Sequence, residues 1–167
     1  MDIDNIFSSL IKEIGYQNNK TVVINKVVMN SKEVEKNNLF VAIRGGNAYV
    51  NEALEKGAFV IYDDNTTNLN NNPNSFLVDD SVKFMQELAH EWRNVLNIKI
   101  IGITGSNGKT TVKDMVFQLL STKYNGKKTE GNYNNHIGLP FTLLRSEKND
   151  DFMVLEMGMS DFGEIEL

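Results

Sequence analysis

The chain has 167 residues, of which 41% are hydrophobic, and its 17 basic and 22 acidic residues give a net charge of −5. These values describe a globular protein of one domain or two small ones, and they argue against a nucleic-acid partner held through its phosphates. Cysteine is missing from the sequence, which excludes disulfides and thiol chemistry. No apolar run approaches 18 residues and no basic-then-apolar leader opens the chain, so we expect a cytoplasmic protein that does not contact membranes.

Residues 1–80 predict a small α/β domain. Apolar residues at helical spacing predict a first helix over 3–14, with Asp2 or Asp4 as its cap and Gly15 as its stop. The asparagine-rich stretch 63–75 predicts a solvated loop. The remaining predicted elements are strands over 21–28, 39–43, 58–62 and 76–78 and a short helix over 51–56.

A helix over residues 81–97, capped by Ser81, is predicted to link this domain to a second one over 98–167. In the second domain, strands over 99–103, 127–130 and 152–156 alternate with helices after residue 109 and over 137–145. This β-α-β-α-β order predicts a parallel sheet. A doubly wound nucleotide domain normally has five or six strands, so we expect a truncated domain, with 163–167 opening another helix.

The most informative segment is 102–111, Gly-Ile-Thr-Gly-Ser-Asn-Gly-Lys-Thr-Thr, which follows an apolar strand and opens a helix. Such a loop presents backbone N–H groups to an anion at a helix N-terminus. Lys109 would reach the terminal phosphates and Thr110 could place its hydroxyl on Mg²⁺. Only two residues separate Gly105 from Gly108, where the usual signature has four, so this is a contracted variant. A glycine turn that only caps the helix is the alternative, and the flanking strand and helix favour phosphate binding.

Two later segments are expected to face the same site. Glu156 ends the third strand of the second domain, where ligands bind in open α/β sheets, and its carboxylate could hold the Mg²⁺ of ATP. A solvent-facing glutamate is the alternative. The run 131–140 follows the second strand, so its asparagines and His136 would lie at the same edge, unless it is only an asparagine-rich loop. His90 is interpreted as a structural or surface residue.

Together these segments resemble the Mur ligase family of ATP-dependent, amide-forming enzymes of cell-wall synthesis. Residues 105–111 are similar to the contracted phosphate loop of the family, and 131–140 and 156–165 are similar to its D-alanyl-D-alanine-adding branch. The N-terminal domain is similar through 39–45 and 53–58. It differs at Asn30-Ser31-Lys32, where the family has Asp-Ser-Arg, and in a shortened segment over 46–51.

The resemblance implies an α/β fold in which a small N-terminal UDP-substrate domain precedes a truncated ATP-binding domain with a phosphate loop. It implies ATP and Mg²⁺ as cofactors, with the metal on Thr110 and Glu156, and catalytic roles for Lys109, Asn134 and Asn135. The nucleotide would be held by Gly105, Ser106, Asn107, Gly108, Lys109, Thr110 and Thr111. The substrate would be held by Ser31, Arg44, Gly45, Asn134 and Asn135.

The implied reaction adds D-alanyl-D-alanine to UDP-N-acetylmuramoyl-tripeptide through an acyl phosphate. Alternatives are a ligase that adds meso-diaminopimelate or lysine, a folylpolyglutamate synthetase, or a non-catalytic nucleotide-binding module. The resemblance covers the first third of a family member, so we expect an N-terminal fragment that is inactive alone. The full-length protein is expected to be monomeric, and this chain to self-associate or to be loosely ordered through an uncovered sheet edge.

Overall fold

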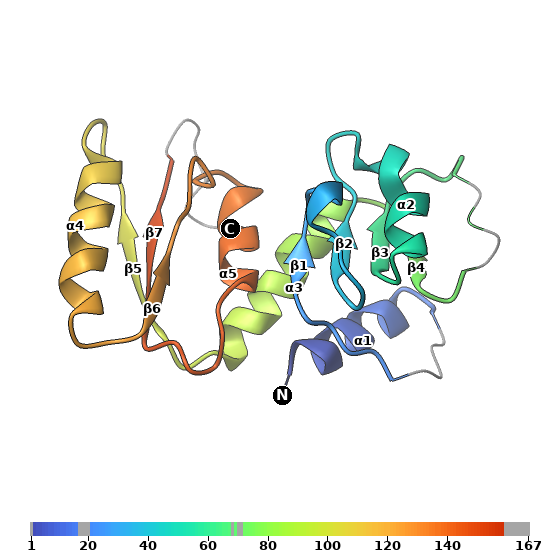
Figure 1. Ribbon diagram of the computed structural model, residues 1–167, viewed down its shortest axis with the longest axis horizontal. Coiled ribbons are helices and arrows are strands. Elements are labelled where there is room, and N and C mark those ends of the chain that lie inside the picture. The colour runs from blue at the N-terminus through green and yellow to red at the C-terminus, as the bar shows by residue number, and fades with distance from the viewer. Residues whose placement is uncertain (1, 17–20, 68, 70–71, 159–167) are drawn as a thin grey trace. The chain divides into compact units, whose positions relative to one another are not determined.

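The computed structural model describes residues 2–16, 21–67, 69 and 72–158 (Figure 1). The expected helix opening at 163–167 lies outside this part of the chain. Internal contacts divide the chain into two compact units, 1–91 and 92–167, so that the division falls within helix α3 (Ser81–Val95). Within the described residues, no helix is both long enough and apolar enough to cross a membrane.

The first unit contains a parallel sheet of four strands in the order β1-β2-β3-β4. The strands are β1 (Val27–Val28), β2 (Leu39–Val41), β3 (Phe59–Tyr62) and β4 (Ser75–Leu77). Apart from Ser75 their residues are apolar, and they are almost entirely buried, as expected for a parallel sheet covered on both faces. The other elements of this unit are α1 (Ile3–Glu13), η1 (Ser31–Glu33), η2 (Gly46–Tyr49), α2 (Val50–Glu55) and the part of α3 up to residue 91.

Helix α1 contributes the aromatic centre of this core. Its buried face carries Ile6, Phe7 and Leu10, as the helical spacing predicted. The Phe7 ring packs edge-on against Phe76 of β4 at 5.4 Å and against Phe84 of α3 at 6.0 Å, measured between ring centroids. This edge-to-face geometry is the one that aromatic quadrupoles favour.

Two local predictions for the first unit were wrong. The strand expected over 21–28 is reduced to β1, because the Ile24 N–H donates to the Asp4 carboxylate (2.8 Å) and the preceding residues do not join the sheet. Ser81 does not cap α3. Instead, the Asp80 carboxylate accepts from the N–H groups of Val82 (2.8 Å) and Lys83 (3.0 Å), because Asp80 occupies the N-cap position. The other boundaries shift by one or two residues.

The second unit contains a parallel sheet in the order β5-β7-β6, with β7 in the centre. Its strands are β5 (Lys99–Ile103), β6 (Gly126–Lys128) and β7 (Phe152–Glu156), and every residue of β7 is buried. The connecting helices are α4 (Lys109–Ser121) and α5 (Gly138–Leu144). The α/β class with parallel sheets is therefore confirmed, as is the β-α-β-α-β order.

Helix α4 buries an unexpected face. Its apolar residues Val112, Met115 and Leu119 are exposed, with Leu119 at 72%, whereas Lys113 is only 3% exposed. The helix packs on β7 and β6 through residues such as Phe117, whose ring lies 5.8 Å from that of Phe152. The side of α4 that carries Val112, Met115 and Leu119 is therefore exposed in the described structure.

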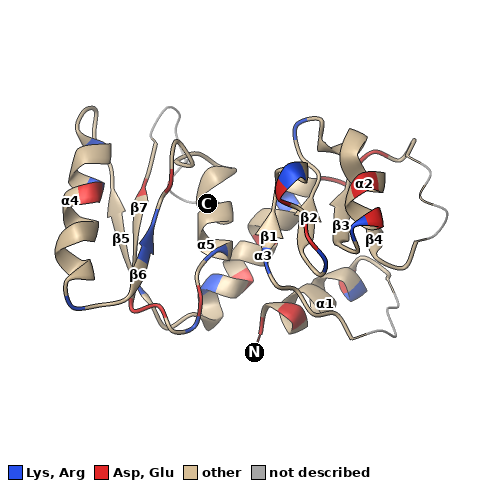
Figure 2. Cartoon of the chain, in the orientation of Figure 1, with Lys and Arg blue, Asp and Glu red and all other residues tan. Residues whose placement is uncertain are grey.

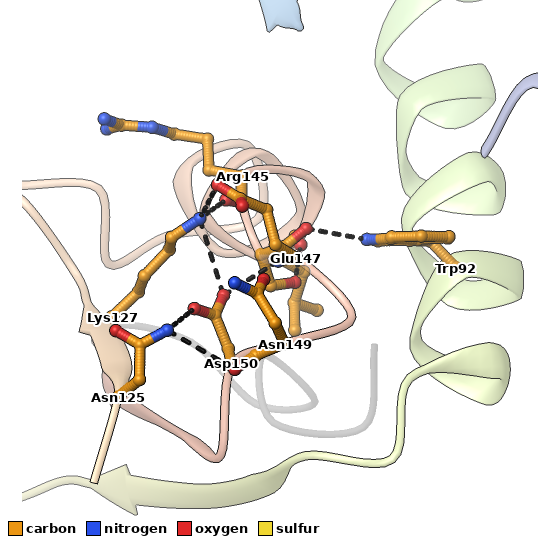
Figure 3. A network of polar contacts seen from close by, with 9 residues as sticks. Trp92, Asn125, Lys127, Arg145, Glu147, Asn149 and Asp150 are labelled. Carbon is orange, nitrogen blue, oxygen red and sulfur yellow. Dashed lines mark hydrogen bonds and ion pairs between the residues drawn. The ribbon is translucent and has the colours of Figure 1, made fainter. Parts of the chain in front are cut away.

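A polar network closes the amino-terminal end of this sheet (Figure 3). The Lys127 ammonium donates to the Arg145 carbonyl and the Glu147 carboxylate, both at 2.7 Å, and lies 3.4 Å from the Asp150 carboxylate. The indole N–H of Trp92 donates to the Ser146 carbonyl (3.3 Å). These contacts hold the connection that leads from α5 into β7.

Acidic and basic residues are interspersed along the chain in both units (Figure 2). Oppositely charged groups pair locally, for example Lys56 with Glu52 and Arg145 with Glu130. No long basic stripe runs along any element of the described ranges, in line with the acidic net charge.

Candidate nucleotide-binding site

The glycine-rich loop joins the carboxyl end of β5 to the first turn of α4. Gly105 and Gly108 have φ angles of +142° and +76°, which L side chains rarely adopt, so glycine is required at both positions. Gly108 is the N-cap of α4, and without a side chain it leaves the amide groups of the first turn uncovered. The loop is exposed to solvent. It therefore has the geometry of an anion-binding helix N-terminus.

Lys109 is the first residue of α4 and lies across this loop. Its ammonium donates to the Gly105 carbonyl oxygen at 2.7 Å. Thr110 follows it in the same turn, and its side chain is exposed. The first turn of α4 thus places a positive charge and a hydroxyl beside the loop.

Glu156 lies at the carboxyl end of β7, in register with Ile103, the last residue of β5 before the loop. It is 5% exposed and therefore does not face solvent. Its Oε1 accepts from the Asn134 amide at 3.1 Å, while Oε2 has no hydrogen-bond partner among the described residues. The Glu156 N–H donates to the buried Thr129 hydroxyl (2.9 Å). The strand order therefore places a well-held carboxylate beside the loop.

The two asparagines that the sequence grouped together have different surroundings. The Asn134 side chain reaches Glu156. The Asn135 side-chain oxygen instead accepts from the N–H groups of Ile137 (3.1 Å) and Gly138 (2.9 Å), so it caps the start of α5. Of these two asparagines, Asn134 is the one whose side chain contacts the Glu156 carboxylate.

Sequence analysis missed Lys113. Its ammonium lies 3.7 Å from Glu156 Oε2 and 3.7 Å from Asp114 Oδ1. Asp114 also accepts from Lys128 at 2.7 Å, and this hydrogen bond is the main reason why the pKa of Asp114 lies below its ordinary value. The spacing of four residues between Lys109 and Lys113 could have identified Lys113 as a site residue. That spacing predicts that both side chains lie on the same side of α4.

The candidate substrate residues Ser31, Arg44 and Gly45 lie in the first unit. Ser31 begins η1, and its carbonyl accepts from Lys56 (3.1 Å). Arg44 and Gly45 follow β2 with φ angles of +48° and +87°, forming a tight turn at the carboxyl edge of that sheet. Directly afterwards, Asn47 donates to Asp63 (2.8 Å), which joins the turn to the end of β3.

A contracted glycine loop after a parallel strand, with a buried carboxylate at the end of the adjacent strand, places the second unit among α/β proteins with phosphate-binding loops. Comparison with known families agrees: the model of the Mur ligase middle domain matches residues 103–167. The second unit is therefore similar in sequence to the middle domain of Mur ligases.

Curated relatives extend this similarity over most of the chain. The UDP-N-acetylmuramoyl-tripeptide–D-alanyl-D-alanine ligase of Bacillus subtilis is 44% identical over 150 residues, which cover 87% of this chain and 33% of the relative. The ligase of the same name from Synechocystis is 38% identical, covering 86% and 33%. The chain thus spans about a third of the length of these relatives.

Solved structures show the same relationship. The MurF ligase of Thermotoga maritima, crystallised in complex with ADP, is 38% identical and has a TM-score of 0.74 over 87% of this chain and 35% of its own. A MurF structure from Acinetobacter baumannii has a TM-score of 0.79 at 24% identity, covering 98% of this chain and 36% of its own. At that identity the second similarity supports the fold alone.

Proposed function

We propose that this chain binds Mg²⁺–ATP through residues 105–111, as the nucleotide-binding part of a ligase that adds D-alanyl-D-alanine to UDP-N-acetylmuramoyl-tripeptide. The observation that carries the proposal is the placement of the exposed Gly105–Gly108 loop beside the buried Glu156 carboxylate. The ADP complex of the Thermotoga relative supports the nucleotide, and the names of the curated relatives support the reaction. The compartment proposed is the cytoplasm.

The residues present fit a magnesium ion. Glu156 Oε2 is buried and has no hydrogen bond from the described part of the chain, so a cation would satisfy it, and oxygen is the ligand that Mg²⁺ prefers. No group of three or more His, Cys, Asp or Glu side chains gathers around a metal position in the described ranges. The fit is therefore to an ion held by Glu156, Thr110, phosphate oxygens and water. Bound there, Mg²⁺ would offset negative charge on the phosphates.

The proposed reaction begins with attack of the tripeptide carboxylate oxygen on the γ-phosphorus of ATP, which breaks the bond to ADP and gives an acyl phosphate. The amine of D-alanyl-D-alanine then attacks the acyl carbon, expels phosphate and loses a proton. Lys109 would neutralise charge on the transferred phosphoryl group, and loop amides would hold the phosphates. Asn134 would orient Glu156, and Ser31, Arg44 and Gly45 would hold the uridine-diphosphate end of the substrate.

Calorimetric titration of Mg²⁺–ATP into the chain tests the nucleotide assignment. We expect binding by the wild type, loss of binding in Lys109→Ala and retention in Lys99→Ala. Lys99 is the matched control because it removes the same charge from the opposite end of β5. Equal binding by the Lys109 and Lys99 variants would contradict the proposal. Release of ADP by the complete protein with D-alanyl-D-alanine, compared with meso-diaminopimelate or lysine as the amine, tests the acceptor.

A further inference from the structure

Lys113 is a buried cation to which the proposed reaction gives no role. It is 3% exposed, although lysine is almost never buried unless it is paired. Helix α4 places it one turn after Lys109, on the side that packs against β7. Moving an ammonium out of water is costly unless an opposite charge compensates for it. The Glu156 carboxylate is such a partner for the Lys113 ammonium.

Of the two carboxylates near Lys113, Glu156 is the one that depends on it. Asp114 has its own partner, since Lys128 donates to it at 2.7 Å, and its side chain is 41% exposed. The Glu156 side chain is 6% exposed and its Oε2 has no hydrogen bond among the described residues. The Lys113 ammonium, at 3.7 Å, is thus the cation that balances this buried carboxylate.

The contact has the geometry of an ion pair without a hydrogen bond. A distance of 3.7 Å is too long for N–H···O bonding, so the lone pairs of Oε2 stay available. Asn134 holds the other oxygen at 3.1 Å. The carboxylate is therefore oriented from one side by an amide and balanced from the other by a charge, with one oxygen free to accept a ligand.

We propose that Lys113 is a positioning residue that orients Glu156 and offsets its charge, so that a divalent cation binds Glu156 together with nucleotide phosphates and not alone. The inference rests on the proposed function, because that function makes Glu156 a cation ligand. A fixed ammonium next to the carboxylate repels a second cation. The phosphate oxygens at the glycine loop supply the negative charge that overcomes this repulsion. The metal then enters as the metal–nucleotide complex.

Binding of Mn²⁺ without nucleotide, measured by the electron paramagnetic resonance signal of the free ion, tests this role. Lys113→Met removes the charge and keeps much of the side-chain length. We expect this variant to bind Mn²⁺ at least about tenfold more tightly than the wild type, because a like charge has been removed. Lys113→Arg should behave as the wild type. Lys128→Met, which removes a lysine from the same cluster, should leave Mn²⁺ affinity unchanged.

The gain should disappear when Glu156→Gln is added to Lys113→Met, since the ligand is then lost. Equal Mn²⁺ affinity of the Lys113→Met variant and the wild type would overturn the proposal, as would a gain that survives Glu156→Gln. If Lys113→Met fails to fold, the Mn²⁺ affinity of the wild type is compared with and without ADP. Equally tight Mn²⁺ binding in both conditions would refute the role proposed for Lys113. The Mn²⁺ titration is made without nucleotide and does not depend on Lys109. A negative result for Lys113 can therefore be told apart from a negative result in the Mg²⁺–ATP titration, which tests the proposed function.

Discussion

Gly158 and Asn134 are joined through their backbones, with the Gly158 N–H donating to the Asn134 carbonyl oxygen across 2.7 Å. This bond ties the connection after β6 to the residues that follow β7. Because the same asparagine donates its side-chain amide to Glu156, the two bonds hold the loop and the carboxylate in a single arrangement. A Cβ atom at position 158 would lie 2.9 Å from the Asn134 carbonyl oxygen, so glycine is needed for the close approach.

Replacement of Gly158 by alanine is therefore expected to lower the free energy of unfolding of the second unit by about 1–3 kcal/mol, the usual range for overpacking. Gly46→Ala is the control, since a Cβ there would meet its nearest atom at 3.4 Å, close to ordinary contact. Urea unfolding measures both variants. Trp92 fluorescence, which reports on the second unit, follows Gly158→Ala, and circular dichroism follows Gly46→Ala. Equal stability of Gly158→Ala and the wild type would contradict the close approach.

Thr129→Val should destabilise the second unit by about 1–3 kcal/mol, because the buried Glu156 N–H would lose its acceptor. The shape of the side chain is nearly unchanged, so packing should be preserved. Thr142→Val is the matched control. Its hydroxyl is also buried, but it donates to a carbonyl inside helix α5 that already has a backbone partner. The urea concentration at the unfolding midpoint should be higher for Thr142→Val than for Thr129→Val.

Asp150 and Glu147 both pair with Lys127 in the network of Figure 3, but only Asp150 is buried. Asp150→Ala removes the buried carboxylate that pairs with Lys127 and also the acceptor for the Glu147 N–H (2.7 Å). We therefore expect the free energy of unfolding to fall by roughly 3 kcal/mol. Glu147→Ala breaks an exposed pair and should cost about 0–1 kcal/mol. Chemical unfolding monitored through Trp92, the single tryptophan of the chain, compares the two. Similar losses for both variants would show that burial is not the deciding factor.

Asp114 should titrate below the ordinary aspartate pKa, chiefly because its carboxylate accepts a hydrogen bond from Lys128. A pKa lowered in the folded state means that the stabilisation is present at neutral pH and is lost as the pH falls through the folded pKa. Carboxyl carbon shifts followed by NMR between about pH 2 and pH 6 measure this pKa. Lys128→Met should move the midpoint upward. An unchanged midpoint in that variant would rule out the assigned cause.

Much of the fold follows from local signals. The apolar run 152–155 followed by Glu156 predicted β7 with the limits that the structure shows, because a strand buried on both faces leaves an uninterrupted apolar segment. The strand before residue 104 and the helix from Lys109 were likewise evident from the glycine loop. Residues 21–26 were mistaken for a strand because their alternation reflects burial of Val22 and Ile24 without sheet pairing. Hydrophobic periodicity indicates which side chains are buried, but it does not indicate which backbone groups form hydrogen bonds with each other.

The sequence by itself determined the glycine-rich loop between β5 and α4, since strand, glycines and helix start lie within about ten residues and act through the local backbone. It also determined that Glu156 ends a strand. Only the tertiary structure decided that Glu156 is buried, that Asn134 rather than Asn135 holds it, and that Lys113 balances its charge. These contacts join α4, the connection after β6 and the end of β7. They exist because β7 pairs between β5 and β6, an order that depends on long-range packing and has no local signature in the chain.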